Sequence, residues 1–142
     1  EVQTQEGFEL EQNDRELDKP KNIVARLKGS GNGKALLLLS HYDSALVPSF
    51  GASDAGSGLV TILESLRAYK ASGKTPKNDV IILFSDCEEI SLNGAKLYVT
   101  EHPWAKDVGF VINFEYLQKH SERRCTAFGI ILYFRSLSVY IF

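Results

Sequence analysis

The feature that most constrains this chain is a run of four leucines that ends in polar residues, Leu36–Ser44 (LLLLSHYDS). The apolar segment 34–40 has the length of a strand and is typical of a strand covered on both faces. His41 and Asp43 follow it directly, so an imidazole and a carboxylate lie where a buried strand ends. We therefore expect a central sheet with chemically active side chains at one edge.

Two more segments have the same apolar character, Asp79–Ser85 (DVIILFS) and Val108–Phe114 (VGFVINF). Between the three strands, Leu59–Lys70 and Leu92–Thr100 carry apolar residues at helical spacing. This alternation of strands and helices is typical of α/β proteins. It predicts a three-layer α/β/α fold with a mixed, mostly parallel sheet.

The N-terminal part of the chain is less regular. Residues 1–21 form a polar segment without a sustained period, which we interpret as a mobile or edge segment. Asn22–Lys28 (NIVARLK) alternates apolar and polar residues and suits a half-buried strand. The short glycine-rich turn at 29–33 predicts that this strand and the leucine strand are antiparallel neighbours. Ser53 or Asp54 is a natural first residue for the long helix.

Composition excludes several classes of protein. With 142 residues, 44% hydrophobic and 24% charged, the chain suits one globular domain. A net charge of −2 gives no basic surface for a nucleic acid, and no apolar run is long enough to span a membrane. Cys87 and Cys125 form no C-x-x-C motif, which argues against redox and cysteine-zinc sites. The chain lacks methionine and opens on Glu1, so we expect a processed product or an excerpt.

All three apolar strands run into acidic residues or a histidine. Ligands bind at the carboxyl edge of parallel strands, where these side chains would gather. Crowded carboxylates repel one another unless they are paired or coordinate a metal, and imidazole with carboxylate oxygen suits zinc. Of two adjacent acids, one can bind the metal while the other serves as general base. The residues concerned are His41, Asp43, Asp54, Asp86, Glu88, Glu89 and Glu115.

Four motifs in order, LLLLSHYDS, GASDAGSG, ILFSDCEE with ISLNGA, and EHPWAKDVGFVINFE, carry a resemblance to a known family. Between Asn22 and Glu115 the chain resembles the catalytic core of the M28 zinc-dependent exopeptidases. It is most similar to the branch of the endoplasmic-reticulum metallopeptidase and the vacuolar membrane protease. The resemblance implies aminopeptidase-type hydrolysis of peptide substrates by metal-activated water. It also implies a luminal, periplasmic or vacuolar domain of a membrane protein.

The resemblance assigns roles to individual residues. His41 and Glu115 would hold a first zinc, Glu89 a second, and Asp54 would bridge the two. Catalytic roles fall to Glu88 as general base and to Asp43 as the supporting acid. The second zinc site lacks its histidine at a family-like position, so two zincs are implied but only one site is complete.

The chain departs from the family at two kinds of position. Cys87 and Ser91 occupy sites where relatives commonly have glycine. Residues 116–142 read as an atypical tail of uncertain structure, with four basic residues against one acid. His120 lies in this tail and is a poor candidate for a ligand. We therefore divide the chain into three segments: a polar N-terminal segment (1–21), an M28-like core (22–115) and the tail (116–142). The core corresponds to the N-terminal part of the family's peptidase core and is incomplete at its C-terminal end.

Two rival functions remain. The chain could be a catalytically inactive M28-fold fragment or interaction module that binds at most one metal. It could also keep the fold and a single zinc but act as a glutaminyl cyclase-like enzyme. A serine hydrolase is disfavoured because no G-x-S-x-G motif is present. For His102, a surface role is expected. The sequence leaves the oligomeric state and the preferred substrate residue open.

Overall fold

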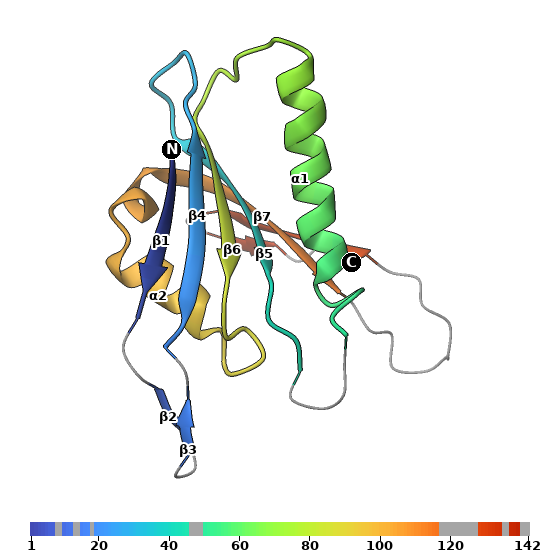
Figure 1. Ribbon diagram of the computed structural model, residues 1–142. Helices are drawn as coiled ribbons and strands as arrows, with labels where there is room; N and C mark the ends of the chain where they lie inside the picture. Colours follow the sequence, from blue (N-terminus) through green and yellow to red (C-terminus); the bar gives the residue numbers. More distant parts are fainter. Residues whose placement is uncertain are drawn as a thin grey trace.

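The computed structural model describes residues 1–7, 10–12, 15–17, 19–45, 50–116, 128–134 and 137–139. Within them a twisted sheet of seven strands forms the middle of the molecule (Figure 1). The strands follow the spatial order β1 (Val2–Glu6), β4 (Lys21–Leu27), β6 (Val80–Ser85), β5 (Ala35–His41), β7 (Val108–Tyr116), β8 (Phe128–Phe134) and β9 (Leu137–Val139). A separate hairpin joins β2 (Leu10–Gln12) to β3 (Arg15–Leu17).

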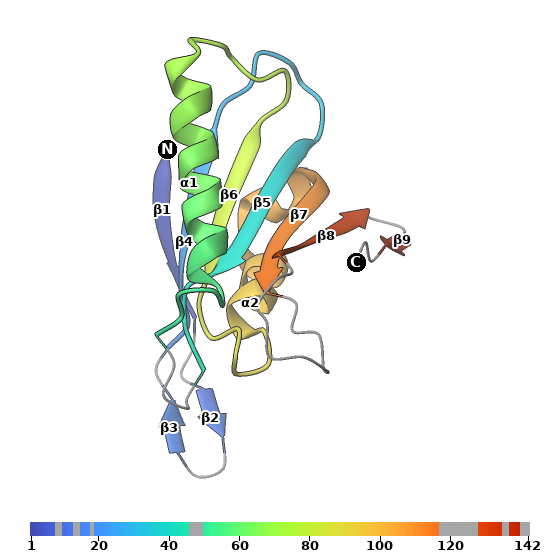
Figure 2. The same ribbon diagram turned by 90° about the vertical axis from the view of Figure 1, so that its right-hand side faces the viewer.

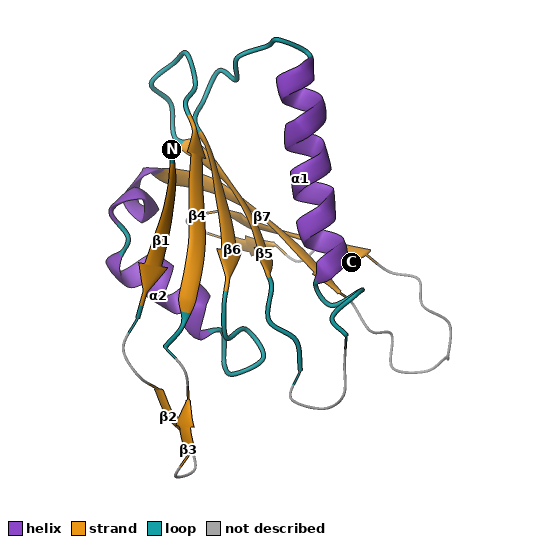
Figure 3. Ribbon diagram, viewed as in Figure 1, coloured by secondary structure: helices purple, strands orange, loops and turns teal. Residues whose placement is uncertain are grey.

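Helices cover the two faces of the sheet. Helix α1 (Gly56–Ala71) lies on one face, and α2 (Asn93–Glu101) with the 3₁₀ helix η1 (Pro103–Asp107) lies on the other (Figure 2). The view by secondary structure shows the sheet between the helical layers (Figure 3). The predicted three-layer α/β/α architecture is confirmed. Among the described residues, no helix is long and apolar enough to cross a membrane.

The sheet is mixed, as predicted, but it is not mostly parallel: among the described strands, antiparallel pairings outnumber parallel ones. Strand β5 pairs in parallel with β6 on one side and with β7 on the other. The pairings further out are antiparallel: β1 with β4, β4 with β6, β7 with β8 and β8 with β9. The parallel pairs are thus confined to the centre, and their carboxyl ends share one edge of the sheet.

One predicted strand pairing is wrong. Strands β4 and β5 are joined by the short turn at 29–33 but are not neighbours, because β6 lies between them. The register places Ile23 opposite Phe84 and Leu38 opposite Ile82. Strand β6 is buried on both faces, so a position between two strands satisfies its backbone better than an edge position does.

The polar N-terminal segment contributes an edge strand. Strand β1 runs antiparallel to β4, with Val2 opposite Ala25 and Glu6 opposite Lys21. The expectation of an edge segment is confirmed for these residues.

The core lies mainly between the sheet and the α2 layer. Its buried members are Val24, Ala35, Leu37, Ile81, Leu83 and Tyr98. On the other face α1 buries Ile62 completely, whereas its neighbour Leu63 is 51% exposed. His102 is also not on the surface: it is 7% exposed, stacks on Tyr98, and its Nδ1 accepts the Trp104 amide.

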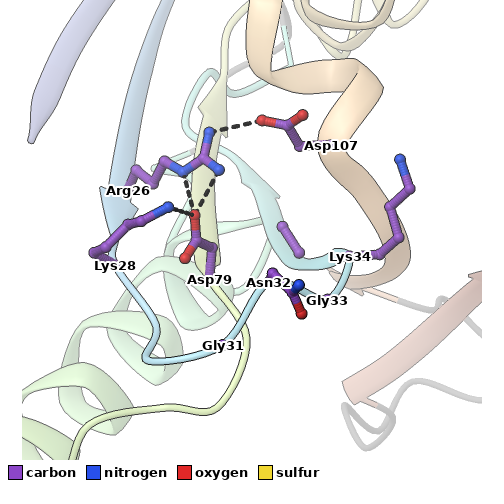
Figure 4. Close-up of a pocket in the computed structure, with 9 residues that line it drawn as sticks. Arg26, Lys28, Gly31, Asn32, Gly33, Lys34, Asp79 and Asp107 are labelled. Atoms are coloured by element: carbon purple, nitrogen blue, oxygen red, sulfur yellow. Dashed lines mark hydrogen bonds and ion pairs between the residues drawn. The ribbon is translucent and has the colours of Figure 1, made fainter.

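An ion-pair network around the buried Asp79 closes the end of the sheet where the parallel strands begin (Figure 4). The Asp79 carboxylate accepts hydrogen bonds from Arg26 Nε at 2.7 Å, Lys28 Nζ at 3.0 Å and the Gly29 amide at 2.8 Å. Arg26 also donates to Asp107 at 2.8 Å. The four charged residues, Arg26, Lys28, Asp79 and Asp107, line a pocket of about 420 Å³. Since its charges satisfy one another, the network serves as a structural tie.

Replacing Asp79 with asparagine is expected to lower the free energy of unfolding by about 3 kcal/mol, because Arg26 would lose a buried partner. The Gly29 amide, Lys28 and Arg26 lower the pKa of Asp79 against the effect of burial. Its stabilising contribution is therefore complete above the unfolded pKa of about 3.9 and is lost as the pH falls through the folded pKa. Urea titrations between pH 3 and pH 7 check this.

The matched control is Asp107→Asn, since Asp107 binds the same Arg26 but its side chain is 38% exposed. It should cost less than about 1 kcal/mol. The structural role of Asp79 would be contradicted if both variants lost the same free energy of unfolding. It would also be contradicted if the free energy of unfolding of Asp79→Asn depended on pH as that of the wild type does.

Candidate metal centre

The candidate centre lies at the carboxyl ends of the three parallel strands. His41 is the last residue of β5 and is 1% exposed. Its Nδ1 lies 3.0 Å from the backbone carbonyl of Asp43. A proton on Nδ1 can be donated to that carbonyl, which leaves Nε2 directed at the neighbouring acids.

Carboxylates from three other segments converge on Nε2 of His41. The Asp54 Oδ1 atom lies at 2.9 Å, Glu115 Oε1 at 3.3 Å and Glu88 Oε2 at 3.9 Å. Ligand atoms of His41, Asp54 and Glu89 all lie within 4.8 Å of one another. The structure thus brings together all the residues predicted as metal ligands, and it places the predicted base beside them.

Asp54 reaches the centre because the first turn of α1, which follows it, packs tightly against the sheet. A Cβ at Gly58 would meet Ser40 Oγ and, at 2.9 Å, the carbonyl of Phe114, so only glycine lets the helix start between β5 and β7. Helix α1 begins at Gly56 and has no side-chain cap. The predicted helix start at Ser53 or Asp54 is therefore wrong. The Asp54 carboxylate faces the imidazole instead.

Asp43 connects the histidine with the following acidic loop. Its Oδ1 accepts the Glu88 amide at 3.1 Å, and its Oδ2 accepts the Glu89 amide at 3.2 Å. Asp43 Oδ1 also lies 3.4 Å from Nδ1 of His41. The carboxylate holds the backbone of the two acids, and the imidazole is bound mainly through the Asp43 carbonyl.

The crowding of acids changes the protonation of the centre. Burial alone would lower the pKa of His41, but Asp43, Glu115 and Glu88 outweigh it and raise this pKa to about 11. Burial raises the pKa of Glu88 and of Glu89, and neighbouring carboxylates add to that rise. The site therefore favours a bound cation, because positive charge relieves the repulsion among its acids.

Asp86, at the end of β6, belongs to a different set of contacts. Its Oδ2 accepts the Lys21 amide at 2.9 Å and its Oδ1 accepts the Cys87 amide at 2.9 Å. The Tyr42 hydroxyl donates to the Lys21 carbonyl at 2.6 Å. Asp86 thus ties the acidic loop to β4. His120 lies outside the described residues.

One imidazole nitrogen with several carboxylate oxygens is a donor set that suits zinc better than calcium or magnesium, whose sites are normally all oxygen. The residues present therefore fit a divalent transition metal, with zinc as the natural choice. A sheet edge that holds such an ion next to a carboxylate of raised pKa is suited to hydrolysis.

A comparison with protein-family models agrees with this chemistry. Residues 22–130 match the model of peptidase family M28. The chain belongs to peptidase family M28. The matched range contains every residue of the metal centre.

The M28 chain is also similar to curated relatives. It is 40% identical over 121 residues to the vacuolar membrane protease of Candida dubliniensis, covering 82% of this chain and 13% of that protein. It is 42% identical over 98 residues to the vacuolar membrane protease of Yarrowia lipolytica, covering 66% and 10%. The chain thus spans a small fraction of the length of these relatives.

Two solved structures with a similar fold are glutaminyl cyclases. The M28 chain matches that of Porphyromonas gingivalis with a TM-score of 0.50 and 33% identity, over 61% of this chain and 30% of the other. A glutaminyl cyclase from an Acidobacteriales bacterium matches with a TM-score of 0.50 and 22% identity, over 62% and 30%, and supports the fold alone.

Proposed function

We propose that the M28 chain is the N-terminal part of the catalytic core of a zinc-dependent, aminopeptidase-type peptidase. Its substrate would be a peptide with a free N-terminus. The observation that carries the proposal is the buried His41, whose Nε2 faces the carboxylates of Asp54 and Glu115, with Glu89 near enough to share a metal. Membership of peptidase family M28 supports it.

His41, Asp54, Glu89 and Glu115 would hold the metal. When bound, zinc would supply a Lewis acid that polarises a carbonyl and lowers the pKa of a coordinated water. Two zincs are the family expectation, with Asp54 shared between them. In the described residues His41 is the centre's only imidazole, so a second site would rest on Asp54 and Glu89 alone and would bind more weakly.

Glu88 would act as the general base. Its carboxylate borders the centre, 3.9 Å from His41 Nε2, and its raised pKa brings it closer to the neutral range where a carboxylate can take up and return a proton. Asp43 would hold Glu88 in place through the backbone amide. The division of labour follows: Glu89 would bind metal and Glu88 would move the proton.

A second candidate function is cyclisation of an N-terminal glutamine by a single-zinc enzyme. The likeness to the Porphyromonas gingivalis glutaminyl cyclase, at 33% identity, favours it. A third possibility is a fragment that binds metal without catalysis. The names of the relatives support a parent protein at the vacuolar membrane.

Removal of the metal is expected to abolish hydrolysis. Dialysis against a chelator should lower the rate on an aminoacyl chromogenic substrate at least about tenfold, and added zinc should restore it. Parallel assays with an N-terminal glutaminyl peptide distinguish the two reactions. Hydrolysis that depends on zinc supports the aminopeptidase, cyclisation supports the second candidate, and zinc binding without either reaction supports the inactive fragment.

A further inference from the structure

Asn22, outside the metal centre, is one of the most deeply buried polar side chains in the described part of the chain. It lies near the start of β4 and is 0% exposed. Its Oδ1 accepts the Asp86 amide at 3.1 Å, and its Nδ2 donates to the Gly94 carbonyl at 2.8 Å. One side chain therefore binds both ends of the loop 86–94, which carries Glu88 and Glu89.

The backbone of this loop adopts conformations that need such support. Cys87, Ser91 and Leu92 have φ angles of 52°, 68° and 61°, a region that costs energy for residues other than glycine. The loop is closed at its base by the Gly94 amide, which donates to the Asp86 carbonyl at 2.9 Å. Contacts from outside the loop must offset the cost of holding it in one shape.

The space around Gly94 shows how closely the base of the loop is packed. A Cβ at this position would meet the Asp86 carbonyl and, at 2.5 Å, Oδ1 of Asn22. The side-chain carboxamide of Asn22 therefore lies directly against the point where the two loop ends meet. At the tip of the loop, Asp43 accepts the amides of Glu88 and Glu89.

We propose that Asn22 is a positioning residue for the metal centre: by binding both ends of the loop 86–94, it fixes Glu89 for metal binding and Glu88 for proton transfer. The proposal rests on the proposed zinc function. Asn22 acts at the base of the loop and Asp43 at its tip, so the loop has two fixed points.

The site requires the chemistry of a carboxamide. Asn22 offers one acceptor to the Asp86 amide and two donors, of which the second reaches Gln5 Oε1 at 3.1 Å. An aspartate would lack the donors, and an apolar side chain would leave both loop ends without their partner. Because an unsatisfied buried polar group is costly, the loop would rearrange to recover hydrogen bonds.

The test is the zinc affinity of Asn22→Ala, measured by competition with a chromogenic zinc chelator. We expect the dissociation constant to rise at least about tenfold, as is typical when a residue that orients a metal ligand is lost. Gln5→Ala is the matched control, since it removes the hydrogen-bond partner of Asn22 that lies outside the loop. The zinc affinity of this variant should stay within about twofold of that of the wild type.

A second control separates positioning from general loss of stability. Asp79→Asn breaks a buried network at the other end of the sheet and should leave the zinc affinity of the folded protein unchanged. If Asn22→Ala does not fold, Asp86→Asn replaces it. Whichever way the new side chain is turned, its NH2 group would face the backbone amide of Lys21 or of Cys87, donor against donor, and loosen the same end of the loop. We expect about a threefold or larger loss of affinity for this variant.

The outcomes are distinct. A folded Asn22→Ala with wild-type zinc affinity would overturn the proposal, as would an unchanged affinity in Asp86→Asn when Asn22→Ala is unfolded. An equal loss in Asp79→Asn would also overturn it. If the wild-type chain itself binds no zinc, the proposed function fails, and that result is recognised before any variant is compared.

Discussion

Replacement of Glu88 by glutamine is expected to lower turnover by at least about a hundredfold, the usual contribution of a general base. The amide has nearly the same shape but cannot accept a proton at neutral pH. Since the proposal assigns metal binding to His41, Asp54, Glu89 and Glu115 and only proton transfer to Glu88, zinc content should remain close to that of the wild type. Steady-state kinetics and elemental analysis of the same preparation measure both quantities.

The control for Glu88→Gln is Glu64→Gln on the exposed side of α1, where Glu64 binds only Arg67 among the contacts described. This change should alter neither turnover nor zinc content. Substantial residual activity in Glu88→Gln would refute Glu88 as the base. A parallel loss of zinc would instead assign it to metal binding.

The second large effect is expected for His41→Ala, which removes the only imidazole that the described residues bring to the centre. Zinc affinity should fall at least about a hundredfold, because the remaining ligands are carboxylates that repel one another. The wild-type melting temperature should rise on addition of zinc, since a ligand that binds only the folded state stabilises it, whereas that of the variant should stay constant.

His102→Ala is the matched control for His41→Ala. His102 is likewise buried, but it packs against Tyr98 and Trp104 away from the centre. We expect it to destabilise the fold by about 2 kcal/mol through lost packing and to retain zinc binding. If both histidine variants keep the wild-type affinity for zinc, His41 is not a ligand.

Much of the architecture follows from local patterns. The apolar runs that lead into His41, Asp86 and Glu115 predict the three parallel strands and the edge at which they end, although Asp86 binds β4 there and not the metal centre. The family resemblance adds Asp54, whose approach depends on the close packing at Gly58. These features can be predicted because a buried strand requires a run of apolar residues and a close approach of two backbones requires glycine, and both patterns are local in the sequence.

Other features depend on contacts between distant parts of the chain. The turn at 29–33 suggests a hairpin, yet β6 separates its two strands because a strand buried on both faces needs two neighbours. The proposed role of Asn22 rests on hydrogen bonds to Asp86 and Gly94, which lie 64 and 72 positions further along the chain. Its one trace in the sequence is its place on the buried side of an alternating strand, two residues before Val24.

Departures from the family pattern also gain a physical meaning. Cys87 and Ser91, where the family resemblance implies glycine, both have positive φ angles. The loop therefore keeps a glycine-type backbone without glycine, at a cost of about 1–3 kcal/mol for each such residue. Its contacts with Asp43 and Asn22 offset that cost.

The most direct test of the metal centre is an anomalous difference map at the zinc absorption edge from crystals grown with zinc. We predict a peak about 2.0–2.2 Å from His41 Nε2 and from a carboxylate oxygen of Asp54, with Glu89 or Glu115 completing the site. A map with zinc bound only elsewhere, or with no peak beside His41, would contradict the account.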